Sequence, residues 1–379
     1  MILSNGFVVT NDFQLKQLDI EIKGDKFVRI GENLDGADKI DMQGKYILPG
    51  FIDVHIHGAC GERISSENPD IKKILKFEST QGVTSIALSL AVAKYENMLN
   101  QLEIGAKESA ESNVTKIIAM NAEGPFLNKK FKGAMGEENI ISPDIDKLDE
   151  MIKHSKGLLK IVAIAPEVEN AIEFIKYAVK KGITVSIGHT NATYEETMLA
   201  IEAGATHAVH TFNAMRPFNH RDPGVLGAVL TDDRVNCEAI CDYIHLNPVT
   251  VDMIYRLKGA DRMIMVSDSV NAAGIEMEEF VAEGVVHTVK DGVVRLLDGT
   301  IAGSSMTLLN GVQHLIKSGI PIANVSKMAS YNPAKSIKME DKVGSISVGK
   351  YADLTILDSE YNVAYTYING LCVFKNKLN

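Results

Sequence analysis

Two textures of hydrophobic and polar positions alternate along the chain. Residues 1–50 contain short apolar runs broken by turns, such as GFVVT before Asn11-Asp12 and a hairpin pattern at Gly24-Asp25. The final stretch, residues 340–379, repeats this pattern in SISVGKYADLTILD and VAYTYING. Short apolar runs between turn residues are typical of β-strands. We therefore expect the two ends of the chain to pair into one small β-domain.

The middle of the chain alternates short apolar runs with longer helix-like segments. This alternation indicates βα units around a parallel sheet. Several of the helix-like segments, among them AIEFIKYAVKKG, end in glycine, as helix C-termini often do. The runs number eight, which closes a barrel. They are YILPGFIDVHIH, TSIALSL, KIIAMNAEG, IVAIAPE, TVSIGHT, HAVHTFNA, NCEAICDYIH and RMIMVSDS.

The predicted fold class is α/β. We expect a (β/α)8 TIM-type barrel over residues 51–339, with a small β-sandwich domain formed by residues 1–50 and 340–379. A chain of 379 residues suits this division, because barrels typically run to about 250 residues and leave room for a smaller module.

Composition and charge narrow the classes of protein that fit. Hydrophobic residues form 45% and charged residues 23% of the chain, as in globular proteins. We find no apolar run near the roughly 20 residues of a membrane span and no secretory signal, so we expect a cytoplasmic protein without a membrane partner. The net charge of −10 argues against a nucleic-acid partner. No disulfide or catalytic role is expected for Cys60, Cys237, Cys241 and Cys372, which form no CxxC pair.

Six of the eight runs close on a group that can bind a metal ion or transfer a proton. The active site of a (β/α)8 barrel lies at the C-terminal ends of its strands. A single histidine at a strand end is more often an ordinary polar residue. Histidines and carboxylates that recur at the ends of several strands are better explained by a metal site. His55 and His57 stand two positions apart, which directs both to one face of a strand. The other groups are Glu123, His189, His210, His245 and Asp268.

Nitrogen and carboxylate ligands without thiolates suit one or two divalent metal ions of zinc, iron or manganese, among which the sequence does not choose. Such an ion activates water and polarises a carbonyl group, so hydrolysis of an amide-like bond is the natural reaction. Asp268 closes the last run and is placed to act as the acid/base. A helix cap is the alternative role for Asp268, but the following SVNAAG reads as a loop.

The motifs PGFIDVHIHG, NAEGPFL, IGHTNATYEE, HTFNAM and VSDSVNAAG resemble those of the N-acetylglucosamine-6-phosphate deacetylases of the amidohydrolase superfamily. The resemblance spans essentially the whole chain and includes GSISVGKYADLTILD near its end. PGFIDVHIHG alone is typical of the superfamily, whereas EGPFL, GHTNAT and HxxNAM in this order are specific to the deacetylases. The resemblance implies that N-acetyl-D-glucosamine 6-phosphate is hydrolysed to D-glucosamine 6-phosphate and acetate in amino-sugar catabolism, by metal-activated water with Asp268 as acid/base.

The resemblance also implies a ligand set. The principal metal ligands would be Glu123, His189 and His210. Family members with two metals use an HxH pair, so His55 and His57 imply a second ion with Glu123 as the bridge. Substrate contacts would fall on Ala134, Asn213, Ala214, Arg221, Asp242, His245, Ile301, Ala302 and Gly303.

Phosphate recognition in an acidic chain needs a cation. A guanidinium group matches phosphate oxygens well, and the resemblance assigns this role to Arg221, whose alternative is a solvated loop charge. The resemblance further implies a homodimer in which the neighbouring chain helps to bind phosphate.

One position departs from the family pattern. The family usually has a histidine that helps to polarise the acetyl carbonyl after a KGA segment, whereas this chain has Met135. A thioether cannot donate that hydrogen bond. Three outcomes stay open: a second metal polarises the carbonyl, another group does so, or the enzyme prefers a different acyl amino sugar.

Other functions are also consistent with parts of this pattern. The N-acetylgalactosamine epimer is an alternative substrate, as is an unrelated cyclic amide. Related cyclic amidases use a carboxylated lysine near the end of the fourth strand, where this chain has Ala165-Pro166-Glu167. A catalytically silent barrel would lack ligands, and every principal ligand is present.

Overall fold

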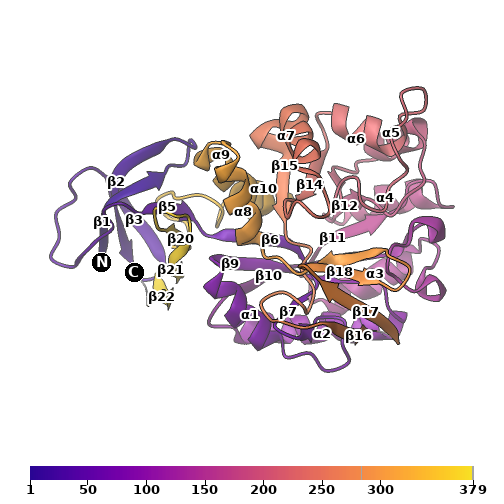
Figure 1. Ribbon diagram of the computed structural model, residues 1–379, viewed down its shortest axis with the longest axis horizontal. Coiled ribbons are helices and arrows are strands. Elements are labelled where there is room, and N and C mark those ends of the chain that lie inside the picture. The colour runs from indigo at the N-terminus through magenta and orange to yellow at the C-terminus, as the bar shows by residue number, and fades with distance from the viewer. Residues whose placement is uncertain (283, 378–379) are drawn as a thin grey trace.

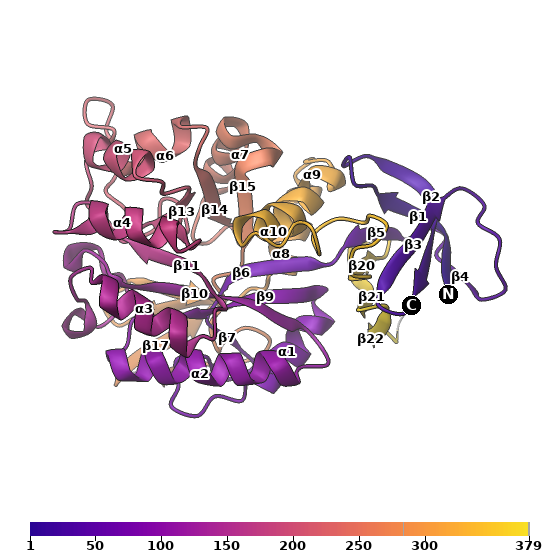
Figure 2. The ribbon, with the colours of Figure 1, turned by 180° about the vertical axis from the view of Figure 1, so that it is seen from behind.

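The computed structural model describes residues 1–282 and 284–377 and contains two eight-stranded sheets. One sheet forms a barrel from the middle of the chain, and the other joins both chain ends beside it. In Figures 1 and 2, the indigo and yellow ends lie together on one side of the barrel. The predicted fold class is confirmed, whereas the exact domain boundaries at residues 50 and 340 stay a prediction.

All eight predicted runs contain a barrel strand. Neighbouring strands pair in parallel, and the ring closes where the Asp268 amide donates to the His55 carbonyl at 2.9 Å. A parallel bridge between Ile56 and Ser269 lies beside this bond. The strands are β6 (Phe51–Ile56), β9 (Val83–Leu90), β10 (Lys116–Phe126), β11 (Leu159–Ile164), β12 (Thr184–Ile187), β13 (His207–Ala208), β14 (Asn236–Ile240) and β15 (Met263–Val266).

Helices follow most of the barrel strands and bury one apolar face each, as an amphipathic helix does. A capping box between Thr193 and Glu196 begins α5. Among the described residues, no helix combines the length and apolarity needed to cross a membrane. The helices are α1 (Ile71–Thr80), α2 (Tyr95–Glu111), α3 (Ile145–His154), α4 (Ala171–Lys180), α5 (Tyr194–Glu202), α6 (Gly224–Thr231), α7 (Pro248–Arg262), α8 (Leu308–Lys317), α9 (Ile322–Ser326) and α10 (Asn332–Ser336).

The two ends of the chain pair into one sheet, as their short apolar runs predicted. The hairpin at Gly24-Asp25 joins β2 to β3, and β20 pairs with β5 across the two chain ends. SISVGK forms no strand, because Gly344 and Gly349 adopt positive φ angles that break an extended backbone. The strands are β1 (Ile2–Val9), β2 (Leu15–Lys23), β3 (Lys26–Gly31), β4 (Lys39–Asp41), β5 (Tyr46–Pro49), β20 (Leu354–Leu357), β21 (Val363–Ile368) and β22 (Leu371–Lys375).

An antiparallel sheet is inserted between β15 and α8, and the sequence interpretation missed it. Its apolar runs are separated by Asp291-Gly292 and Asp298-Gly299, which are strong hairpin turn pairs. Val294 packs with Val270 and Ala302 in a separate small core. The strands are β16 (Glu279–Ala282), β17 (Val285–Lys290), β18 (Val293–Leu296) and β19 (Ile301–Ser304), and a further short pair follows β6: β7 (Gly58–Ala59) with β8 (Glu62–Arg63).

Candidate active site and metal centre

The fold brings the candidate ligands together at the C-terminal ends of five barrel strands. His189 follows β12, His210 follows β13 and Asp268 follows β15, and all three have positive φ angles. A positive φ is uncommon for residues other than glycine, and such conformations cluster at functional sites. These turns direct the three side chains inward, where they are buried.

The first ligand group consists of Glu123, His189 and His210. Glu123 Oε1 lies 3.0 Å from His189 Nε2 and 2.8 Å from His210 Nε2, and the two Nε2 atoms are 3.0 Å apart. His189 Nδ1 lies 2.8 Å from the Phe131 carbonyl oxygen. Because a carbonyl only accepts, Nδ1 carries the proton, and the lone pair of a neutral His189 Nε2 faces the carboxylate. The Glu123 oxygen is also an acceptor, so a positive charge, either a metal ion or a proton, must lie between these two atoms.

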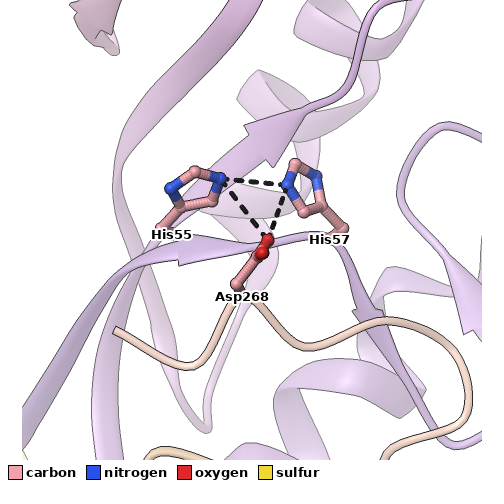
Figure 3. A group of neighbouring side chains, drawn as sticks. All are labelled: His55, His57 and Asp268. Carbon is pink, nitrogen blue, oxygen red and sulfur yellow. Dashed lines mark hydrogen bonds and ion pairs between the residues drawn. The ribbon is translucent and has the colours of Figure 1, made fainter. Parts of the chain in front are cut away.

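The second ligand group consists of His55, His57 and Asp268. The two Nε2 atoms are 3.0 Å apart, and Asp268 Oδ1 lies 3.3 Å from His57 Nε2 and 3.6 Å from His55 Nε2. Figure 3 shows both rings and the carboxylate directed toward one point. His55 in β6 and His57 directly after it therefore lie in one group.

Glu123 lies between the two groups. Its Oε1 contacts the first group, and its Oε2 lies 3.1 Å from His57 Nε2. Burial alone would raise the pKa of Glu123, but the charges of His55 and His57, with the close contacts to the His189 and His210 rings, hold this pKa well below its usual range. The ionised carboxylate can bridge two cations.

The donor set fits a divalent metal. It offers imidazole nitrogens and carboxylate oxygens, each group's atoms within 4.8 Å of one another, as zinc, iron or manganese require. The contact between His189 Nε2 and Glu123 Oε1 likewise calls for a positive charge between the two atoms. Sites for one or two divalent ions are thus present, and the donor set leaves the element open.

Glu238 supports both groups, and the sequence interpretation missed it. Its Oε2 accepts a hydrogen bond from His55 Nδ1 at 3.0 Å and from the His210 amide at 3.1 Å. Partners of this kind fix the tautomer and orientation of metal-binding histidines. The available signal was a carboxylate between the apolar residues Cys237 and Ala239 of β14, where a buried charge needs a partner.

Glu167 lies outside both groups. Its carboxylate accepts hydrogen bonds from the Asn128 and Thr190 side chains and from the Asn191 amide. Glu167 therefore anchors the loop that follows His189. Cyclic amidases have a carboxylated lysine near the end of the fourth barrel strand, and residues 165–167 after β11 contain no lysine.

A cavity of about 440 Å3 opens onto the ligands, including Glu123 and Asp268. Asp242 lies behind the cavity wall, where it accepts hydrogen bonds from His245 Nδ1 at 2.7 Å and from the Ser304 hydroxyl. Arg221 is exposed and lies outside the cavity of its own chain. The other residues expected to contact substrate line the cavity: Ala134, Asn213, Ala214, His245, Ile301, Ala302 and Gly303.

Met135 also lines this cavity and is 9% exposed. Its carbonyl accepts a hydrogen bond from Lys132 Nζ at 3.1 Å. Its side chain packs with Val92, Leu127 and Ile140 in a small apolar cluster. The position that the family usually gives to a histidine is therefore an apolar wall of the cavity here.

Comparisons with known proteins agree with this geometry. The amidohydrolase family model matches residues 46–373. The chain is 32% identical to N-acetylglucosamine-6-phosphate deacetylase of Lysinibacillus sphaericus, over 94% of each protein. It is 30% identical to N-acetylgalactosamine-6-phosphate deacetylase of Escherichia coli O157:H7, over 87% of this chain and 88% of that protein.

Solved structures give the same result. An Asp-to-Ala mutant of N-acetyl-D-glucosamine-6-phosphate deacetylase from Mycobacterium smegmatis, in complex with N-acetyl-D-glucosamine-6-phosphate, superposes with a TM-score of 0.93 at 29% identity, over 99% of both chains. The Thermotoga maritima deacetylase superposes with a TM-score of 0.90 at 32% identity, over 99% of this chain and 100% of that chain. The chain belongs to the amidohydrolase family, within its group of N-acetylglucosamine-6-phosphate deacetylases.

Proposed function

We propose that the chain hydrolyses the acetyl amide of N-acetyl-D-glucosamine 6-phosphate to acetate and D-glucosamine 6-phosphate in amino-sugar catabolism. The observation that carries this proposal is the pair of buried ligand groups joined by Glu123 at a cavity, in a chain with relatives of that name. The proposal includes a cytoplasmic location, which cell fractionation tests; activity confined to the membrane or secreted fraction would contradict it.

Glu123, His189 and His210 would hold the principal divalent ion, which would be zinc, iron or manganese. His55 and His57 would hold a second ion, with Glu123 as the bridge. Bound ions supply Lewis acidity, which makes water a stronger acid and the acetyl carbonyl a better electrophile. Of the three alternatives given for Met135, the group of His55, His57 and Asp268 supports the first, in which a second ion would polarise the acetyl carbonyl.

Asp268 is the proposed acid/base. Burial alone would raise its pKa, but the hydrogen bond with His57 and the charges of His55 and His57 lower the pKa to about 2. At neutral pH the carboxylate is ionised and can take a proton from the attacking water. As the C–N bond breaks, Asp268 returns this proton to the leaving nitrogen, and acetate separates from the free amine.

Phosphate recognition is proposed to involve His245. Burial opposes its charge, but the hydrogen bond and charge of Asp242 raise the pKa of His245, and the pKa of Asp242 is lowered in turn. The protonated ring can donate from Nε2 to an anion in the cavity. Asn213 and Ala214, with Ala134 and the segment 301–303, are the proposed sugar and phosphate contacts.

A substrate panel tests the proposed substrate. We expect kcat/KM of the metal-loaded protein to be at least about a hundredfold higher for N-acetylglucosamine 6-phosphate than for N-acetylglucosamine, because charged hydrogen bonds to phosphate are lost in the latter. N-acetylgalactosamine 6-phosphate is the second candidate, favoured by the relative from Escherichia coli O157:H7. Equal rates with and without phosphate would contradict the assignment to sugar phosphates.

A homodimer is part of the proposal. The outer face of α7 exposes Val249, Met253 and Leu257 at helical spacing, with exposed fractions of 75%, 39% and 49%. Apolar side chains in such a stripe favour burial against a partner. Phe218, which is 56% exposed, lies in the same loop as Arg221.

We propose that dimerisation buries these side chains and brings Arg221 to the phosphate in the cavity of the second chain. Sedimentation at micromolar concentration tests the assembly, and the expected mass is twice the 41.3 kDa of one chain. A mass of one chain across the concentration range would contradict it.

A further inference from the structure

A single buried histidine stands on the inner face of the inserted sheet. In β17 the burial pattern leaves only His287 fully buried, and it is 5% exposed. A strand that covers a core normally places an apolar residue at such a position. His287 instead lines the cavity that contains the ligand groups. A polar side chain here needs a hydrogen-bond partner.

The tautomer of His287 follows from its backbone contact. Nδ1 lies 3.0 Å from the carbonyl oxygen of Val285. Since a carbonyl only accepts, Nδ1 donates its proton, and Nε2 of the neutral ring is left as an acceptor. Within the described part of the chain, no residue forms a hydrogen bond with this Nε2.

The His287 ring is held by stacking on a neighbouring aromatic side chain. Phe280 faces His287 across the β16–β17 pair, and their rings stack at a centroid distance of 4.6 Å with an interplanar angle of 11°. Burial lowers the pKa of His287 and outweighs the hydrogen bond to the Val285 carbonyl, which raises it; the charge of Arg63 lowers the pKa further, so the ring is neutral near pH 7. A fixed, neutral acceptor therefore borders the cavity.

We infer that His287 is a specificity-determining residue whose Nε2 accepts a hydrogen bond from a ring hydroxyl of the bound amino sugar. This inference rests on the proposed function. Phosphate and acetyl oxygens accept hydrogen bonds, so they do not match an acceptor, whereas sugar hydroxyls donate. The amide N–H of the substrate also donates, but the carbonyl beside it must lie at Glu123 and Asp268. His287 belongs to neither ligand group, so we do not assign the amide N–H as its partner.

The test combines one substitution with altered substrates. H287F keeps an aromatic ring to stack on Phe280 but removes the acceptor. Steady-state kcat/KM is measured with N-acetylglucosamine 6-phosphate and with analogues that lack the hydroxyl at C1, C3 or C4. H287Q restores an acceptor at similar reach. T288V, which alters the other face of β17, is the matched control.

We expect the native chain to lose about tenfold in kcat/KM on one of the three analogues, because one hydrogen bond is removed. H287F should lose about tenfold on the parent substrate and nothing further on that analogue. H287Q and T288V should stay within about threefold of the native chain on the parent substrate.

Three results would overturn the inference. H287F could match the native chain on every substrate, it could lose equally on the parent substrate and all three analogues, or its loss could vanish when N-acetylglucosamine without phosphate is the substrate. Acetate release by the native chain from the parent substrate tests the proposed function separately. If that release is absent, both proposals fail; if it is present and H287F behaves as the native chain, only this inference fails.

Discussion

D268N is expected to lower turnover by about a thousandfold or more, because the amide can neither accept the proton of the attacking water nor deliver it to the leaving nitrogen. Asp268 is placed for both transfers, since its carboxylate borders the cavity and lies against His57. The substitution preserves size and removes only the ionisable group. Acetate release at saturating N-acetylglucosamine 6-phosphate measures the effect.

Metal content separates catalysis from assembly of the site. The principal ligands do not include Asp268, so D268N should keep the ion held by Glu123, His189 and His210, as elemental analysis would show. D298N is the matched control, because Asp298 lies in an exposed turn of the inserted sheet. Turnover by D268N near that of D298N would assign the acid/base role to another residue.

E123Q is expected to lose metal from both groups at once and to lower turnover by about a thousandfold or more, since several kcal/mol of charge stabilisation depend on the ions. The carboxylate contacts His189 and His210 through one oxygen and His57 through the other. Replacement by an amide removes the charge that a bridging ligand supplies. Elemental analysis of the purified protein measures the loss directly.

Two further variants make the bridge testable. H57Q alters only the second group, so it should lose one ion and keep the ion at His189 and His210. E169Q, on an exposed position after β11, should keep the native metal content. A native metal content in E123Q, or loss of the same single ion in E123Q and H57Q, would show that Glu123 is not a bridge.

The barrel and the positions of the candidate ligands were accessible from sequence because hydrophobic runs and strand ends follow one geometry. His55 lies in β6 and His57 directly after its end, so the two-residue repeat of a strand directs both to one side, and His189 and Asp268 close runs that are buried on both sides. The barrel then brings these ends together, although long stretches of chain separate them.

Other parts of the site were less accessible because their roles depend on contacts between distant segments. Glu238 sits inside an apolar run, and only the packed barrel shows that it reaches His55. His287 and Phe280 reach the cavity through the inserted sheet, whose turn pairs were present but not interpreted. For Arg221, the single chain shows an exposed loop residue, and the proposed contact of Arg221 with phosphate requires the proposed second chain.

The most direct test of the account is the dependence of product formation on metal. The purified chain is treated with a chelator, reloaded separately with zinc, iron or manganese, and supplied with N-acetylglucosamine 6-phosphate while acetate and glucosamine 6-phosphate are both quantified. We predict that chelation abolishes turnover and that at least one metal restores it, with the two products formed in equal amounts. Equal acetate release by the metal-free and reloaded chain, or none from the fully loaded chain, would contradict it.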